Sequence, residues 1–395
     1  MAQITVGGKR HPISEAIDRT RVRACLECGK CTAICPGHRA HPAFSPRDIV
    51  KKGLLTLTEG LPCDKDMWHC ITCRLCKEVC VQNVDIPEFV RAVRREAQEQ
   101  NNKGQETHDG LVQASCDILQ EPDLKPERLY WVEPDMKVKI DGKPSSGTDV
   151  LLFVGCSPFF NIIFKEFDQN ADIAKASVRV LNNLGVEPIL LSDERCCGHD
   201  EHWTGDDKGF KKLKDLNVKR IKASGAKTIV TPCPECAYTL KELYDLEGIE
   251  VLHMTQYLAR HLMHVRSKPI LGQLDLGAVA FHDPCRLGRY MREFDAPRVV
   301  LDAINGPKKK ELQFEGPVGR CCGVHAWISC TEGSRQLRHD RMKEAQDAGA
   351  DVLVTACPKC RIHFNCYLHS QSVEPVKIKV EDLTVLVAKA MGVFK

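Results

Sequence analysis

The arrangement of the cysteines constrains this chain more than any other feature of its sequence. The chain has 395 residues, and 22 of them are cysteine. Two runs near the N-terminus share the spacing C-x2-C-x2-C-x3-C. Farther along, adjacent cysteine pairs in ERCCGH (194–199) and GRCCGV (319–324) are each followed by glycine. A fold for this chain therefore has to bring several closely spaced groups of thiols to defined places.

The remaining composition is that of a soluble globular protein, with 43% hydrophobic residues, 28% charged residues and a net charge of +3. We find no basic tract that would bind nucleic acid. The longest apolar runs, such as VLLFVG (150–155), are far shorter than the roughly 20 residues of a membrane helix, and MAQITVGGKR has no signal core. We therefore predict a cytoplasmic protein without direct membrane insertion. Its many reduced cysteines then indicate metal or redox chemistry.

Each N-terminal run predicts a [4Fe–4S] cube, because close spacing lets a short loop wrap three thiolates around one cluster. The fourth cysteine of a run lies one helical turn farther on and reaches the other cluster. The predicted sets are Cys25, Cys28, Cys31 with Cys80, and Cys70, Cys73, Cys76 with Cys35. Zinc is the alternative, but it usually takes two separated C-x2-C pairs. The flanking segments ISEAIDRTRVRA and PEFVRAVRREAQEQ look helical, so we predict an α-helical ferredoxin-like domain for electron transfer.

The C-terminal part contains an internal repeat of about 125 residues. DVLLFVGC (149–156) matches GAVAFHDPC (277–285), and KTIVTPCPECAYTL (227–240) matches DVLVTACPKCRIHF (351–364). Helix-like segments such as 172–185 and 334–349 lie between the apolar strands. Strands that alternate with helices predict parallel α/β sheets, whose sites lie at the carboxyl ends of the strands. We expect two such domains, related by pseudo-twofold symmetry, with their sites facing each other.

Each copy of the repeat offers five cysteines, one more than a cube or a zinc ion needs. The sets are Cys156, Cys196, Cys197, Cys233, Cys236 and Cys285, Cys321, Cys322, Cys357, Cys360. A surplus thiolate can bridge two metals and so distort a cluster. Gly198 and Gly323 permit the tight turn that aims both adjacent sulfurs at one site. Structural zinc and a vicinal disulfide are the alternatives, the second disfavoured in a reducing compartment.

These motifs resemble a known family. The C…CCG…C-x-x-C pair resembles the cysteine-rich CCG domains in the B-type subunit of heterodisulfide reductase. The N-terminal half, with SPRDIVKKGLL (45–55), resembles the C-type subunit of that enzyme. Together they look like the fused, D-type form. The resemblance implies that each five-cysteine set binds a noncubane [4Fe–4S] cluster, and that a substrate disulfide between the two clusters takes one electron from each. The ten cysteines of these sets would then be the catalytic ones.

The predicted domains are a ferredoxin-like domain (1–105), a linker (106–148), a first CCG domain (149–270) and a second CCG domain (271–395). The linker is expected to hold a helix near Leu111–Leu119 and a short strand near Tyr130–Val132. Cys63, Cys116, Cys330 and Cys366 fall outside every set, and we expect ordinary buried thiols there.

The predicted function is that of an iron–sulfur oxidoreductase subunit of a heterodisulfide reductase-like complex. A flavoprotein of the heterodisulfide reductase A type, able to bifurcate electrons, would feed the cubes, since the chain has no G-x-G-x-x-G motif of its own. So many clusters indicate an anaerobic source. One alternative is a non-catalytic electron wire, as in the relatives found in benzoyl-CoA reductase, glycolate oxidase or glycerol-3-phosphate dehydrogenase complexes. Another is a zinc-stabilised scaffold.

Histidines and basic side chains beside the cysteines are further candidates for functional residues. A histidine next to a cluster loop can donate a proton to a leaving thiolate, although a hydrogen bond to sulfur or backbone is the simpler expectation. Basic side chains there can bind anionic groups or raise cluster potentials, although surface charge is the simpler expectation. The residues concerned are His199, His202, His282, His325, Arg195, Arg286, Arg289, Arg320, Lys359 and Arg361.

Overall fold

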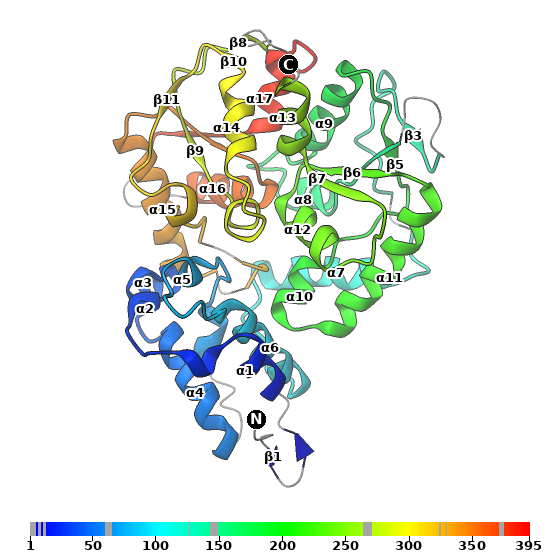
Figure 1. Cartoon of the computed structure of the whole chain (residues 1–395). Helices are drawn as coiled ribbons and strands as arrows, with labels where there is room; N and C mark the ends of the chain where they lie inside the picture. Colours follow the sequence, from blue (N-terminus) through cyan, green and yellow to red (C-terminus); the bar gives the residue numbers. More distant parts are fainter. Residues whose placement is uncertain are drawn as a thin grey trace. The chain divides into compact units, whose positions relative to one another are not determined.

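The computed structural model describes residues 5–6, 9–10, 13–59, 65–125, 127–142, 149–263, 271–323, 325–328, 330–370 and 375–395. The chain forms two compact units, each assembled from three stretches of sequence (Figure 1). The first comprises Met1–Ala114, His199–Phe210 and Gly323–Leu337. The second comprises Ser115–Gly198, Lys211–Cys322 and Arg338–Lys395. The four domain boundaries predicted from the sequence stay a prediction.

The first unit is helical, apart from a hairpin of β1 (Thr5–Val6) and β2 (Lys9–Arg10). Its helices are α1 (Ser14–Arg19), η1 (Val22–Ala24), α2 (Lys30–Ile34), α3 (Pro36–Ala40), α4 (Pro46–Glu59), η2 (Lys65–His69), α5 (Leu75–Glu78), α6 (Ile86–Glu99), η3 (His108–Gly110) and α10 (His199–Thr204). Helix α6 is amphipathic and buries Phe89, Val90 and Ala97 against Ile17. Cys70 and Cys76 belong to the same core, so the thiols are embedded in packed apolar side chains.

The second unit contains two parallel sheets, one in each copy of the repeat. The strands of the first are β3 (Lys139–Ile140), β4 (Val150–Leu152), β5 (Ile189–Leu190), β6 (Thr228–Thr231) and β7 (Glu250–His253). Those of the second are β9 (Ala278–His282), β11 (Lys308–Lys310), β12 (Val352–Thr355) and β13 (Lys379–Asp382). A small parallel pair joins β8 (Leu271–Gln273) to β10 (Ile304–Asn305). Strands β4, β9 and β12 are buried along their whole length, as expected of parallel strands covered on both faces.

Helices cover these sheets (Figure 1). They are α7 (Leu111–Gln120), α8 (Ser157–Ile163), α9 (Ala171–Asn183), α11 (Asp207–Ser224), α12 (Pro234–Glu242), α13 (Met254–Met263), η4 (Arg286–Tyr290), α14 (Asp295–Asp302), η5 (Gly316–Val318), α15 (Glu332–Asp347), α16 (Pro358–Ser370) and α17 (Leu383–Ala390). Helices α7, α11 and α15 begin in stretches of the first unit, but most of their residues fall in the second.

The two sheets have the same strand order. The first runs β3-β5-β4-β6-β7 and the second runs β11-β9-β12-β13, so that β5, β4, β6 and β7 correspond to β11, β9, β12 and β13. Helix α9 packs on α17, and α13 packs on α14. Buried side chains of both sheets and of these four helices form one continuous hydrophobic core. The two copies of the repeat are therefore packed into a single body.

The expected helical first part and the parallel α/β repeat agree with this architecture. The helices expected at 172–185, 334–349 and 111–119 are present as α9, α15 and α7. The strand expected near Tyr130–Val132 is wrong, because Val132 N–H bonds back to Leu129 O in a turn that buries Trp131. Among the described residues, no helix is long and apolar enough to cross a membrane.

Candidate functional site

The first predicted cube site is a cavity in the first unit. Cys25, Cys28, Cys31 and Cys80 all line it. Gly29 turns the loop in the left-handed conformation (φ 77°), which leads directly into α2 and brings Cys31 back toward Cys25. The backbone N–H of Val84 donates to Cys80 Sγ over 3.4 Å. The cavity thus has four sulfurs on its wall, drawn from both cysteine runs.

The second predicted cube site is more deeply buried. Cys70, Cys73 and Cys76 are buried and lie on a loop with left-handed residues at Thr72 and Arg74. Burial raises the pKa of the Cys35 thiol, and the charges of Cys73 and Cys70 raise it further. Cys35 therefore lies in the electrostatic field of this loop, as the predicted pairing requires.

A buried arginine supports this loop. Arg94 on α6 is fully buried and donates to the carbonyl oxygens of Met67 (3.0 Å) and Cys70 (2.6 Å). It also donates to Trp203 O over 3.1 Å. His325 Nδ1 lies 3.1 Å from Thr72 Oγ1, the hydroxyl next to Cys73. The sequence singled out His325 as a candidate proton donor, with a hydrogen bond to sulfur or backbone as the simpler expectation, but it did not single out Arg94. In the structure they hold the backbone around the second cube site.

The first five-cysteine set forms a continuous chain of thiol contacts at the carboxyl ends of β4, β5 and β6. Hydrogen bonds link Cys156 to Cys196, Cys196 to Cys197, Cys197 to Cys236, and Cys236 to Cys233. Gly198 closes the turn after the adjacent pair in the left-handed conformation, with φ 77°. A Cβ atom on Gly155 would lie 2.8 Å from Cys236 Sγ, so the glycine makes room for that sulfur.

The second set repeats this chain at the ends of β9, β11 and β12. Hydrogen bonds link Cys285 to Cys321, Cys321 to Cys322, Cys322 to Cys360, and Cys360 to Cys357. The order of contacts is the same as in the first set. His363 on α16 adds an imidazole, with Nδ1 3.4 Å from Cys322 Sγ. Position 363 corresponds to Thr239 of the first copy, so the two sets differ here.

In each set, one thiol of the adjacent pair has a lowered pKa. Hydrogen bonds from Cys116, Cys156 and Cys197 hold the pKa of Cys196 well below its usual value. Hydrogen bonds from Cys321 and Cys360 do the same for the pKa of Cys322. Two thiolates on one tetrahedral metal, with bonds of about 2.3 Å, have sulfurs about 3.8 Å apart. Each set likewise joins neighbouring thiols into a chain, and it has the all-sulfur chemistry that iron–sulfur clusters need.

The two sets lie next to each other. Lys359 Nζ is 2.7 Å from Glu235 Oε2, and the two side chains are 5% and 14% exposed. Each of these residues is the variable position of a C-P-x-C motif, one in each copy. Burial raises the pKa of Cys357 to about 11, and the charge of Cys233 from the other set contributes. The C-P-x-C loops of the two copies are therefore in direct contact.

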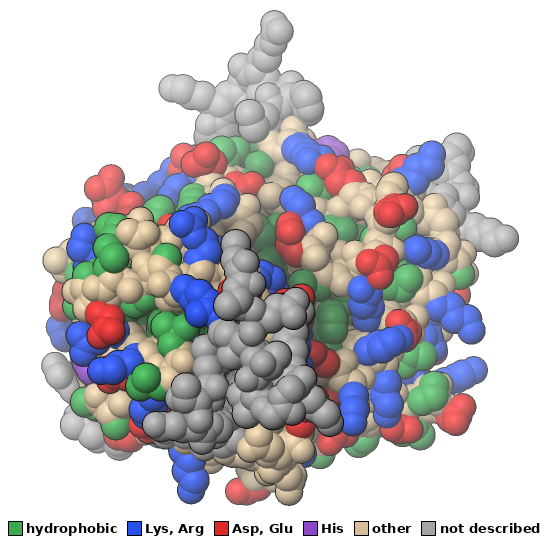
Figure 2. All heavy atoms as spheres, turned by 60° about the horizontal axis from the view of Figure 1, so that its bottom comes forward, with side chains coloured by type: hydrophobic (Ala, Val, Ile, Leu, Met, Phe, Trp, Pro, Cys, Tyr) green, Lys and Arg blue, Asp and Glu red, His purple; other side chains and the backbone are tan. Residues whose placement is uncertain are grey.

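The basic residues beside the cysteines make hydrogen bonds, ring contacts or ion pairs within the protein. Arg289 donates to Gly319 O over 2.8 Å and so holds the approach to Cys321. The Arg286 guanidinium lies 4.2 Å from the centre of the Tyr290 ring. Arg361 pairs with Asp168 and Arg320 with Glu344, each over 3.7 Å. On the face drawn in Figure 2, lysine and arginine side chains are interspersed with aspartate and glutamate.

The candidate histidines are also engaged. Burial lowers the pKa of His282 to about 3, and its Nδ1 accepts from Arg341 over 3.2 Å. The His282 imidazole is therefore neutral near pH 7. His199 Nδ1 lies 3.0 Å from Asp200, and the ring stands edge-on to His325. The His202 ring stands edge-on to Trp203.

Four cysteines were expected to be ordinary buried thiols, but those that the structure describes differ in burial and in contacts. Cys330 is exposed, Cys366 is partly buried, and Cys63 lies outside the described residues. Cys116 on α7 hydrogen-bonds to Cys196 of the first set. Sequence reasoning missed this contact because Cys116 belongs to no motif and lies outside the repeat.

Comparison with known proteins agrees with this architecture. Residues 150–241 and 279–365 each match the family model "Cysteine-rich domain" (CCG), and residues 21–84 match "4Fe-4S dicluster domain". The chain is 30% identical to the D-type subunit of dihydromethanophenazine:CoB–CoM heterodisulfide reductase of Methanosarcina barkeri, over 95% of this chain and 96% of the relative. The chain belongs to the D-type family of heterodisulfide reductase subunits. It is therefore an iron–sulfur oxidoreductase subunit, as predicted.

Two further matches are more distant. The B-type subunit of fumarate reductase (CoM/CoB) of Methanothermobacter marburgensis is 25% identical, over 91% of this chain and 71% of the relative. A crystal structure of a hypothetical protein from Helicobacter pylori covers 96% of this chain and 72% of its own, at 12% identity and a TM-score of 0.56, which shows a shared fold. The predicted cofactors are confirmed at the level of the family. The dicluster domain carries cubane [4Fe–4S] clusters, and the CCG cysteine sets fit noncubane ones.

Proposed function

We propose that this subunit reduces a disulfide at the two five-cysteine sets. The first noncubane cluster would be held by Cys156, Cys196, Cys197, Cys233 and Cys236. The second would be held by Cys285, Cys321, Cys322, Cys357 and Cys360. The observation that carries the proposal is the Glu235–Lys359 contact, because it places the two sets side by side. A disulfide needs two electrons to become two thiols, and two adjacent clusters, when bound, supply one each.

The protein's own residues prepare the place for this reaction. Eight of the ten cysteines are buried, whereas Cys156 and Cys285 are only partly buried. These two occupy the same position in the two copies, so they mark the side from which a disulfide would approach both sets. Burial of the other sulfurs excludes water and strengthens the electrostatic interactions around them.

The proposal includes a pseudo-twofold relation between the two CCG domains. Helix α9 of the first copy packs on the last helix of the second, α17. Helix α14 of the second copy packs on the last helix of the first, α13. Such reciprocal contacts are those of a self-complementary interface. The matching strand orders and the Glu235–Lys359 pair support the same relation.

We further propose that electrons reach this chain from a flavoprotein of the heterodisulfide reductase A type in a multi-subunit, cytoplasmic complex. The cubes of the first unit would receive them, through the sets Cys25, Cys28, Cys31, Cys80 and Cys35, Cys70, Cys73, Cys76. The relatives named as subunits of heterodisulfide and fumarate reductases support a partner of this general kind. Strictly anaerobic native purification, with mass spectrometry of the bound proteins, tests it. Recovery of a hydroxyacid flavoprotein or a ring-reducing enzyme instead would contradict the flavoprotein assignment.

Variants of the adjacent pairs test the cluster assignment. Cys197→Ser and Cys322→Ser should each remove one noncubane signal from the electron paramagnetic resonance spectrum, leave both cubane signals, and abolish disulfide reduction. Cys28→Ser is the matched control, since it should disturb a cubane signal only. Loss of the cubane signals in the first two variants would refute the assignment.

One observation favours a second function, that of an electron relay. The buried Glu235–Lys359 ion pair bridges the two C-P-x-C loops, and a disulfide entering between them would have to displace it. If the purified chain with all its clusters accepts electrons but reduces no disulfide, the relay function stands and the catalytic proposal fails.

A further inference from the structure

The first five-cysteine set has a cysteine neighbour that lies outside the repeat. The Cys116 thiol hydrogen-bonds to Cys196, which also receives hydrogen bonds from Cys156 and Cys197. In the second set, the hydrogen bonds to Cys322 come from Cys321, Cys360 and an imidazole, that of His363. The sequence contains no cysteine between Cys236 and Cys285, so the second copy has no counterpart of Cys116 ahead of its first ligand position.

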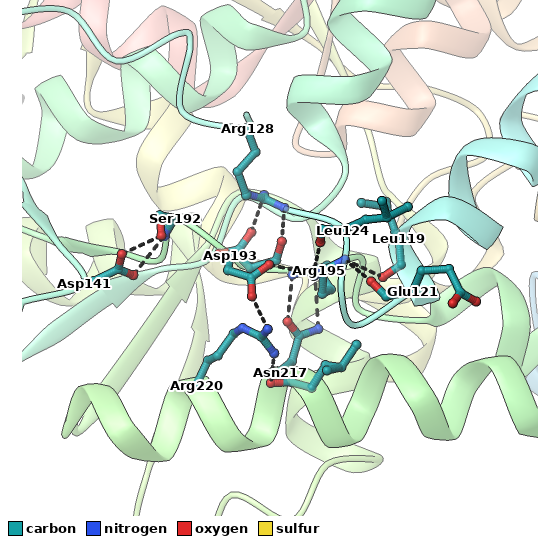
Figure 3. Close-up of polar contacts among 12 residues, drawn as sticks. Leu119, Glu121, Leu124, Arg128, Asp141, Ser192, Asp193, Arg195, Asn217 and Arg220 are labelled. Atoms are coloured by element: carbon teal, nitrogen blue, oxygen red, sulfur yellow. Dashed lines mark hydrogen bonds and ion pairs between the residues drawn. The ribbon is translucent and has the colours of Figure 1, made fainter. Parts of the chain in front are cut away.

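The position of Cys116 is fixed by a buried arginine. Arg195 directly precedes Cys196 and is fully buried. Its guanidinium donates to Leu119 O (3.2 Å) and Glu121 O (3.0 Å), at the end of α7, the helix that carries Cys116 (Figure 3). The same close-up shows Arg195 reaching Leu124 as well. The Arg195 side chain thus ties the last turn of α7 to the loop that carries the adjacent pair Cys196–Cys197.

Two further groups make this segment part of the site. The Asn217 side chain accepts from the backbone N–H of Arg195 (2.8 Å) and donates to the backbone oxygen of Cys196 (2.9 Å). It therefore fixes the backbone of both residues. Arg128 donates to Gly155 O (2.6 Å) and to Glu194 Oε1 (2.7 Å), so it holds the residues before Cys156 and Cys196. Leu119 packs with Cys196 in the same buried cluster. The segment expected to be a linker is therefore built into the first set.

We propose that Cys116 is a sixth thiolate ligand of the cluster at the first five-cysteine set. The Cys116 thiol hydrogen-bonds to Cys196, and two thiolates on one tetrahedral metal are likewise direct neighbours, with sulfurs about 3.8 Å apart. The clamp on α7 holds it there without a metal. When a cluster binds, Cys116 would lose its proton to solvent, and its sulfur would bond to iron in place of the thiol–thiol hydrogen bond.

The consequence is a chemical difference between the two clusters. At the first set, an internal thiolate fills a coordination position that a substrate thiolate would otherwise take. In the second set, the imidazole of His363 lies beside Cys322 instead. This inference rests on the proposed cluster assignment and deepens it, because it makes the second set the one that binds an external thiolate.

Differential alkylation of the full chain, purified anaerobically with its clusters, tests the ligand. Iodoacetamide labelling with peptide mass spectrometry would be done before and after iron removal with a chelator. Cys366 is the internal control, because it is a partly buried cysteine of the same unit outside both sets. We expect Cys116 to be protected at least tenfold until iron is removed, while Cys366 reacts equally in both samples. Labelling of Cys116 at the same rate before and after iron removal would overturn the inference.

Spectra of variants provide a second readout. Cys116→Ser should shift both the signal and the midpoint potential of one noncubane cluster, with the other clusters unchanged, and Cys366→Ser should change none. Protection of Cys116 without any spectral change in Cys116→Ser would mean burial alone and would also overturn the inference. If Cys197→Ser and Cys322→Ser leave the noncubane signals intact, the cluster assignment itself fails. If those two behave as proposed and Cys116→Ser does not, only the sixth ligand is wrong.

Discussion

The ion pair between the two C-P-x-C loops offers a quantitative test of how the CCG domains are joined. Lys359 and Glu235 lie 2.7 Å apart and are almost fully buried. At an effective dielectric constant of about 20, unit charges at this distance attract by about 6 kcal/mol. Desolvation of both ions offsets much of that. Removing one partner, however, takes the counter-charge away from a buried ion and typically costs about 3–5 kcal/mol.

We therefore expect Glu235→Gln to lower the midpoint of thermal unfolding by on the order of 10 °C, since about 1 kcal/mol corresponds to about 2–4 °C in a domain of this size. The double variant Glu235→Gln/Lys359→Gln should recover part of the loss, because neither charge is then left alone. Anaerobic thermal unfolding of the cluster-loaded chain, followed by circular dichroism, measures both.

The chain contains a matched control. Arg260 and Glu250 also lie 2.7 Å apart, but about half of each side chain is exposed. An exposed pair contributes about 0.2–1 kcal/mol, so Glu250→Gln should shift the midpoint by only about 1–3 °C. If Glu235→Gln shifts the midpoint no more than Glu250→Gln, or if the double variant loses the sum of both single losses, the loops are not coupled as described.

Three further predictions concern other contacts. Arg94→Met removes the guanidinium that donates to the buried Met67 and Cys70 carbonyl oxygens, so it should destabilise the first unit by roughly 3 kcal/mol and lower its cubane iron, measured per chain, while the noncubane signals persist. Gly155→Ala should lose the first noncubane signal, because its Cβ would lie 2.8 Å from Cys236 Sγ. Gly185→Ala has a similarly positive φ but open space, and equal iron loss in both would contradict this reasoning. Burial raises the pKa of Asp382 to about 6, so the folded state loses stability as the pH rises from about 4 to about 6, where this group ionises more easily in the unfolded chain. Asp382→Asn keeps an acceptor for Thr384 N–H and should raise the unfolding midpoint above about pH 6, with the gain vanishing below about pH 3, where aspartate is protonated in both states. A gain that persists at pH 3 would contradict the assigned pKa.

Motif spacing was enough to predict which cysteines gather. Eighteen cysteines fall in four sets by spacing alone, and the structure brings each set together, because short loops at strand ends and helix turns leave their thiols few other places to lie. The parallel sheets also followed from the alternation of apolar strands and helices. Whether these sets bind the proposed clusters stays a prediction.

Long-range contacts were beyond sequence reasoning. Arg94, Arg128 and Arg195 resemble surface residues in a sequence, since their burial depends on carbonyl groups that come from distant segments. Cys116 carries no motif, and only the Arg195 clamp brings it to Cys196. Trp131 looked like part of a strand because its neighbours are apolar, yet the chain turns there to bury the indole.

The first unit is completed by two late segments of the chain, His199–Phe210 and Gly323–Leu337. Trp203 supplies a carbonyl acceptor to Arg94, and Trp327 supplies one to Thr107. During synthesis, the cysteines of both cube sites leave the ribosome before these two segments, so the first unit is incomplete until residue 337 has been made. A cluster inserted into a nascent or truncated chain would therefore bind to an incompletely folded unit. The fold thus favours cluster insertion after residue 337 has been translated.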